Sequence, residues 1–253
     1  MCTMQRALRN FIMFSAFVGA VSLSAQTADD VVARHVAAVG GKDVISQVKS
    51  ISMDTTTHIA DSDMPGTLVT LDGVAYRSEL DFNGAKMVQC YTAKGGWIVN
   101  PMAGITDPTP MPDDEFQAGK SAIYVGGGLH DYEANGNKLQ LLGKDANTYT
   151  VKLTTKDNTE STYVFDAATY LVKSTSRKGK FQDQDVTITT SLSDYRKTDI
   201  GLVVPYAISI DFGDQFSLSI TVNKVEVNKP VDPAICDLPK TSQPPDQHKP
   251  SPN

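Results

Sequence analysis

Histidine and carboxylate side chains are the residues in this sequence that could do acid–base chemistry or bind a metal ion. The four histidines, His35, His58, His130 and His248, are far apart in the chain. His130 and Asp131 come shortly after the three consecutive glycines Gly126–Gly127–Gly128, where a backbone could approach a ligand and His130 could transfer a proton. The same residues are also typical of the exit from a helix into a turn, and we favour that interpretation.

An acidic cluster of Asp113, Asp114 and Glu115 could bind calcium. Calcium loops, however, place their oxygen ligands at alternate positions, and these three residues are consecutive. Favourable charge at the start of a helix explains the cluster better. The sequence also has no metalloprotease, phosphate-binding or nucleophile-elbow motif and no C-x-x-C pair. We therefore expect no metal, no cofactor and no enzymatic activity.

The N-terminal segment is typical of a signal peptide. Arg6 and Arg9 precede an apolar run from Phe11 to Val21, which is shorter than the roughly 20 residues that a membrane-spanning helix needs. Cys2 precedes this run, so no cysteine is placed for a lipid anchor directly after it. We expect residues 1–25 to be removed and the mature protein to be soluble in the periplasm, with a retained anchor as the alternative.

The composition favours one acidic β domain over two small ones. Without residues 1–25 the chain has 21 basic and 29 acidic side chains, a formal charge of −8. This acidity disfavours nucleic acid and anionic lipid surfaces as partners. We expect residues 26–239 to form a single monomeric domain. Residues 240–253 are polar and rich in proline, and we expect them to be disordered.

Two cysteines, Cys90 and Cys236, remain after the signal peptide. Two are too few for a disulfide-rich scaffold. We expect Cys236 to be a small buried apolar residue and neither thiol to be essential for folding. A bridge between them is the alternative, since an exported protein reaches an oxidising compartment.

The apolar pattern predicts a mainly β protein with an N-terminal helix. Thr27 suits the start of that helix and Gly40–Gly41 its end, and a short helix over about 42–48 follows. From Ile51 onward apolar residues recur at every second position, with turn residues between the runs, including Arg177–Lys178–Gly179. We expect a curved antiparallel meander with strands near 50–59, 66–72, 74–83, 86–93, 96–99, 138–144, 148–155, 160–166, 169–178, 184–197, 203–212 and 215–227.

An insertion interrupts the meander. Prolines between 100 and 112 remove donors from a ladder, so we expect a loop there, followed by a helix over about 113–122. Trp97, the only tryptophan, comes just before this loop. It is either an ordinary core residue or part of a cavity under the helical segment, which would also be lined by Met87, Phe116 and Tyr124.

Several short segments of the mature chain are similar, in order, to those of one family. They are Gly40–Gly41 with Val48–Lys49–Ser50, Tyr76–Arg77–Ser78–Glu79–Leu80, Gly96–Trp97–Ile98 with Pro101, the run from Tyr163 to Leu171, and Leu238–Pro239. Together they resemble the LolA-like family of periplasmic lipoprotein carriers, which includes the outer-membrane lipoprotein-sorting proteins.

The resemblance implies both a fold and a function. Members of the family form an unclosed β-barrel with helices as a lid over an apolar cavity, and true carriers hold lipoprotein acyl chains there. By this resemblance the chain would be a divergent member that binds or carries an acylated or otherwise apolar ligand. The alternative is an interaction module for an envelope protein, with no small ligand.

Overall fold

A computed structural model describes residues 26–181 and 184–238. The expected signal peptide and the expected disordered tail therefore lie outside the described residues. Within the described part, none of the helices is both long enough and apolar enough to cross a membrane.

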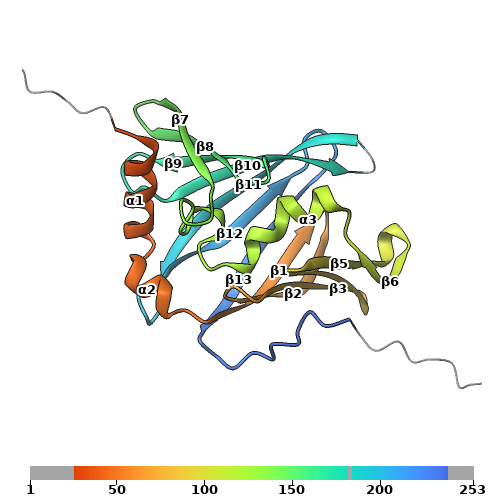
Figure 1. The fold of residues 1–253 in the computed structure, drawn as a ribbon. Coiled ribbons are helices and arrows are strands. Elements are labelled where there is room, and N and C mark those ends of the chain that lie inside the picture. Colours follow the sequence, from red (N-terminus) through yellow and green to blue (C-terminus); the bar gives the residue numbers. More distant parts are fainter. Residues whose placement is uncertain (1–25, 182–183, 239–253) are drawn as a thin grey trace, which may run out of the picture.

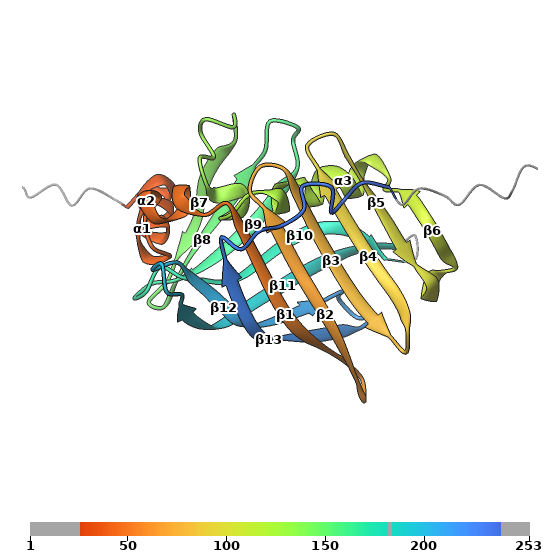
Figure 2. The ribbon, with the colours of Figure 1, turned by 90° about the horizontal axis from the view of Figure 1, so that it is seen from below.

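Thirteen antiparallel strands form one curved sheet (Figures 1 and 2). They are β1 (Ser50–Ile59), β2 (Ser62–Leu71), β3 (Ala75–Phe82), β4 (Ala85–Thr92), β5 (Gly95–Asn100), β6 (Ile105–Pro110), β7 (Lys138–Lys144), β8 (Thr148–Thr154), β9 (Glu160–Asp166), β10 (Val172–Phe181), β11 (Gln184–Lys197), β12 (Val203–Asp211) and β13 (Ser217–Val227). The order is β6-β5-β4-β3-β2-β1-β13-β12-β11-β10-β9-β8-β7, so the edges β6 and β7 are not paired and the barrel is not closed. The prediction of a mainly β, unclosed barrel is confirmed.

All twelve predicted strands are present, with their ends shifted by a few residues. The structure has a thirteenth strand, β6, that we did not predict. We expected prolines to prevent a strand in the insertion, and this prediction is wrong. β6 contains Pro108 and Pro110 and pairs irregularly with β5, for example Ile98 with Thr109. An edge strand tolerates proline because its outer side needs no N–H donors. The prediction of a turn at 177–179 is also wrong, because β10 continues through Phe181.

The helices are short and lie against the sheet. They are α1 (Ala28–Ala38), α2 (Lys42–Gln47), α3 (Asp113–Gly119) and the single-turn 3-10 helices η1 (Pro101–Ala103), η2 (Lys120–Ile123) and η3 (Gly127–Leu129). In the α1 capping box, the Asp30 amide donates to Thr27 Oγ1 at 3.1 Å and the Thr27 amide donates to Asp30 Oδ2 at 2.9 Å. Gly40 and Gly41 then adopt positive φ of 126° and 85°, which ends the helix as predicted.

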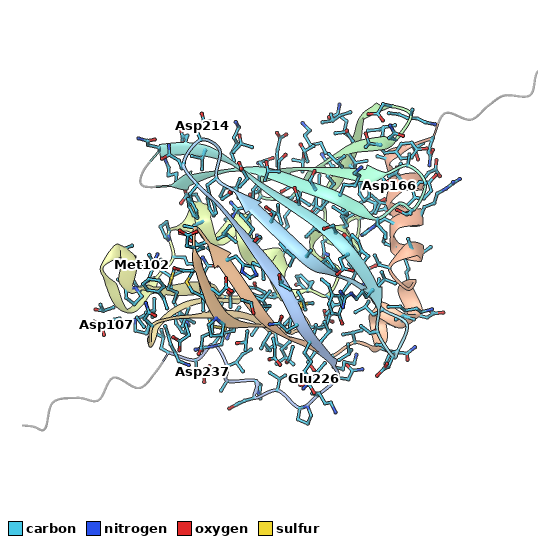
Figure 3. All side chains as sticks on the ribbon, turned by 180° about the vertical axis from the view of Figure 1, so that it is seen from behind. Met102, Asp107, Asp166, Asp214, Glu226 and Asp237 are labelled. Carbon is cyan, nitrogen blue, oxygen red and sulfur yellow. A yellow bond between two sulfur atoms is a disulfide. The ribbon has the colours of Figure 1, made fainter. Side chains whose placement is uncertain are left out.

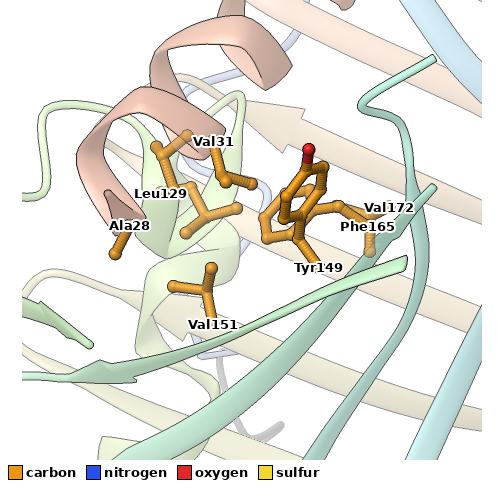
Figure 4. Close-up of a cluster of buried hydrophobic side chains, with 8 residues drawn as sticks. Ala28, Val31, Leu129, Tyr149, Val151, Phe165 and Val172 are labelled. Carbon is orange, nitrogen blue, oxygen red and sulfur yellow. The ribbon is translucent and has the colours of Figure 1, made fainter. Parts of the chain in front are cut away.

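The core at one end of the molecule lies between α1 and strands β8–β10 (Figure 4). Val31 and Val32 of α1 pack on Val151 and Phe165, all nearly inaccessible to solvent. Asp166 holds the β9–β10 turn that aligns these strands: its Oδ1 accepts hydrogen bonds from the Ala168 and Thr169 amides at 3.1 and 2.9 Å. Asp166 is labelled in Figure 3. Burial of such side chains, at roughly 1.5–3 kcal/mol each, fixes α1 on the sheet.

A C-terminal strap, residues 228–238, lies along the outer side of strands β1–β5 (Figure 2). The Asn228 side chain starts it, accepting from the Lys49 amide at 2.6 Å and donating to the Gln47 carbonyl oxygen at 3.0 Å. Near its end Cys236 is joined to Cys90 of β4 by a disulfide. Our preferred expectation of two free thiols is therefore wrong, and the bridged alternative holds.

Candidate ligand-binding face

The face of the sheet that carries Tyr76 and Tyr91 is its inner, concave face. A helical insert, residues 111–129, crosses this face (Figure 1), and Met111, Phe116 and Ile123 of the insert pack on the two tyrosines. The Tyr91 ring stacks on that of Phe116 with 6.4 Å between centroids. Burial raises the pKa of Tyr91 to about 12, so this phenol stays neutral.

Two glycines allow the insert to approach the sheet closely. A Cβ atom on Gly96 of β5 would lie 2.7 Å from Met111 Sδ, and one on Gly119 of α3 would lie 2.5 Å from the Tyr91 ring. Real Cβ atoms do not make contacts this short. The closed position of the insert therefore depends on the missing side chains at these two positions.

Beyond the insert, the concave face continues as two rows of facing residues. Strand registers fix one row as Met87, Leu80, Gly66, Thr55 and Val222, and the next as Met64, Thr57, Ile220, Ile208 and Leu192. Directly opposed residues in antiparallel strands share a face, and Met87 is four residues from Tyr91 on the same strand. Both rows therefore lie on the face that the insert partly covers.

The apolar members of these rows differ in burial: Met64 and Val222 are buried, whereas the others are only partly buried. Met87, Leu80, Ile220 and Ile208 all keep intermediate exposure. Within the described residues, none of these four belongs to a buried hydrophobic cluster. The concave face thus carries apolar side chains whose surface the fold itself leaves incompletely covered. Leu80 leans over Gly66, where an added Cβ would lie 3.4 Å from Leu80 Cδ1.

Of the four predicted cavity residues, the structure brings two to this face. Met87 and Phe116 both lie on the concave side, whereas the Trp97 side chain points to the outer side. There its Nε1 donates to the Cys236 carbonyl oxygen of the strap at 2.7 Å. Tyr124 is 40% exposed beside the β2–β3 turn. Trp97 and Phe116 lie on opposite faces of the sheet. Trp97 pairs with Cys90 and shares its face, whereas Phe116 packs on Tyr91, the next residue of β4, whose side chain points to the other face.

The histidines lie in different surroundings. His35 is buried on α1, with its ring edge on Phe165 and its Nδ1 3.0 Å from the Tyr170 carbonyl oxygen, and burial lowers its pKa. His58 pairs with Asp63 at 2.6 Å near a hairpin end. His130 Nε2 is 3.2 Å from Asp131, and its buried Nδ1 has no hydrogen-bond partner. His248 is outside the described residues.

The acidic cluster at 113–115 begins α3, which is its predicted structural role. Over 26–181 and 184–238, no three histidine, cysteine, aspartate or glutamate side chains are grouped so as to hold a metal ion.

Sequence reasoning missed three polar residues of the concave face. Thr55 and Thr57 are 4% and 5% exposed among its apolar side chains. Arg177 faces Ile188, which lies on the same face of β11 as Leu192. The alternation of β10 could have located Arg177, but its position beside Lys178 and Gly179 is equally typical of a turn.

The sequence matches no family model and no curated protein. Its fold is similar to two crystal structures. One is of a LolA superfamily protein from Nitrosomonas europaea, with a TM-score of 0.55, 10% identity, and coverage of 83% of this chain and 97% of that one. The other is described as an outer membrane lipoprotein-sorting protein domain from Vibrio parahaemolyticus, with a TM-score of 0.53, 10% identity, and coverage of 81% and 95%. At this identity the likeness establishes the architecture alone. The chain has the LolA-like fold that its short motifs predicted.

Proposed function

We propose that this protein is a periplasmic binding or carrier protein for an acylated or otherwise apolar ligand. The ligand would lie on the concave face of the sheet, beside and beneath the helical insert. The observation that supports this proposal is the set of half-buried apolar side chains in the two rows, above all Met87, Leu80, Ile208 and Ile220. An acyl chain would bury their remaining apolar surface.

The energies are adequate for such binding. Each buried methylene contributes roughly 0.8 kcal/mol, so about twelve of them supply roughly 10 kcal/mol before the cost of association. Part of this is offset by lost translational and conformational freedom. A dissociation constant in the micromolar range, about −8 kcal/mol, is the expected net result.

Three further observations support export and an acyl ligand. The pattern of residues 1–25 is that of a signal peptide, and a disulfide such as Cys90–Cys236 persists in oxidising compartments. One protein of similar fold is described as an outer membrane lipoprotein-sorting protein domain, and lipoproteins carry acyl chains.

Ligand titration of delipidated protein tests the proposal. A fluorescent acyl-chain analogue should bind saturably, and Ile220→Glu should weaken binding by at least about tenfold because it places a charge on the apolar face. The matched control is Ser219→Glu, the adjacent exposed residue on the other face of β13, which should bind as the wild type does. Absence of saturable binding to folded, ligand-free protein would refute the proposal.

A second candidate function, recognition of an envelope protein, is favoured by a separate groove. This groove of about 450 Å³ lies between α1 and residues 129–134, with Val32, Val36 and Leu129 on its walls and Asp29 and Glu133 at its rim. A photo-crosslinking amino acid at exposed Ala33 would capture such a partner in living cells. Acyl-chain binding without any crosslink would leave the carrier function alone.

A further inference from the structure

Arg177 is a cation among the apolar and hydroxyl-bearing side chains of the concave face. Arg177 of β10 is half-buried and faces Ile188 of β11. A Cβ atom on Gly179 would lie 3.2 Å from Arg177 Nη1 and 2.6 Å from Ile188 Cδ1. The guanidinium therefore lies back over Gly179, beside an aliphatic side chain.

Arg177 has little to bind within the described part of the chain. Its side-chain hydrogen bond runs from Nη1 to the carbonyl oxygen of the adjacent Lys178 at 3.4 Å, which is long. No carboxylate of residues 26–181 or 184–238 forms an ion pair with it within 4.0 Å. A guanidinium offers five donors in a fixed fork, so most of its hydrogen-bonding capacity is unused.

The helical insert places an acid near this guanidinium. α3 packs against β10, and Glu115 is a half-buried residue of α3. Burial raises the pKa of Glu115, and the Arg177 charge opposes that rise. The phenol of Tyr91 experiences the charge of both residues. Arg177, Glu115 and Tyr91 therefore lie near one another where the insert meets the concave face.

We propose that Arg177 binds the anionic headgroup, a carboxylate or a phosphate, of an amphiphile whose apolar chain lies along the concave face. This inference rests on the proposed carrier function and names the ligand class. A planar oxyanion satisfies two guanidinium donors at once, and such charge-assisted bonds are among the strongest available to a partly buried site. Glu115 lies near the same cation, so its carboxylate competes with the ligand headgroup.

The test compares four ligands that share a dodecyl chain and differ in headgroup. These are dodecanoate, dodecyl phosphate, dodecanol and dodecylamine, titrated below their micelle concentrations. With wild-type protein, the preferred anion should bind about tenfold or more tightly than dodecanol, as one charge-assisted interaction implies, and the amine more weakly. The comparison of dodecanoate with dodecyl phosphate identifies which anion is bound.

Three variants separate the headgroup site from the chain site. Arg177→Gln should remove the preference for anions while dodecanol still binds, which also shows that the variant is folded. Glu115→Gln should strengthen anion binding, a gain that misfolding cannot produce. Lys178→Gln, the exposed neighbour on the other face, should behave as the wild type does.

The outcomes distinguish this inference from the function on which it rests. The role of Arg177 is overturned if the wild type binds anions and dodecanol equally well, or if the preference for anions survives Arg177→Gln. Either result leaves the carrier function in place. Failure of all four ligands to bind folded, ligand-free protein overturns both.

Discussion

Removing the Cys90–Cys236 disulfide should destabilise the whole domain. The bridge joins β4 to the C-terminal strap and closes a loop with a sequence separation of 146 residues. Next to the bridge, two further hydrogen bonds hold the strap to the outer face. The Trp97 Nε1 donates to the Cys236 carbonyl oxygen at 2.7 Å, and Arg77 Nη1 donates to the Ile235 carbonyl oxygen at 2.9 Å.

The chain-entropy model gives the magnitude. For a loop of this length it predicts about 5 kcal/mol of stabilisation at 25 °C, as an upper value, because the cross-link restricts the unfolded chain. The Trp97 and Arg77 hydrogen bonds to the strap, at roughly 1 kcal/mol each, remain in the folded protein without the bridge. We therefore expect the Cys90→Ala/Cys236→Ala protein to lose about 2–5 kcal/mol of unfolding free energy.

Urea denaturation, followed by far-UV circular dichroism and by fluorescence, measures this loss. Trp97 is the only tryptophan and lies under the strap, so its fluorescence reports on strap attachment. Wild-type protein treated with a reductant should match the double variant, and the reductant should not affect the variant further. A loss below about 1 kcal/mol would refute the reasoning. A fluorescence transition that precedes the circular dichroism transition would mean that the strap detaches on its own.

Three other predictions concern packing, capping and pH. Gly96→Ala should lower the free energy of unfolding by about 1–3 kcal/mol in a thermal or urea melt, because the new Cβ would collide with Met111 and the Cys90 carbonyl oxygen. Gly95→Ala, which has open space around it, is the control and should be nearly neutral. Thr27→Ala should cost about 1 kcal/mol through loss of the α1 cap, and an unchanged melting temperature would contradict this. Burial lowers the pKa of His35 in the folded state, so the unfolded chain takes up a proton at higher pH than the folded one does. The free energy of unfolding should therefore fall as the pH drops below about 6.5. A His35→Gln variant whose unfolding free energy depends on pH as steeply as that of the wild type would contradict this.

Local patterns in the sequence predicted most of the fold. Period-two alternation located twelve strands, and Thr27 with Gly40–Gly41 fixed the ends of α1, because both signals act within a few neighbouring residues. β6 was missed because its prolines exclude a central strand, and only the strand order reveals that it lies at an edge.

The candidate site was harder to predict because it depends on which face each strand presents. Alternation gives the relative face of Met87 and Tyr91 within β4, but it does not say which face the insert covers. The sequence therefore left Trp97 either in the core or under the insert, and it is a core residue that the strap covers on the other side. The Cys90–Cys236 pairing likewise follows from the path of the strap, which no local pattern encodes.

The pairing of β1 with β13 has a consequence for when the protein can fold. These strands are the first and the last of the sheet in sequence, yet they are adjacent near its middle. Contacts between residues this far apart form late, since closing so long a loop costs entropy before any contact compensates for it. Until β13 is synthesised, strands β1–β6 and strands β7–β12 can form two separate meanders, but nothing joins the two through β1. The continuous concave face, to which both halves of the chain contribute, comes into existence only after β13 has arrived.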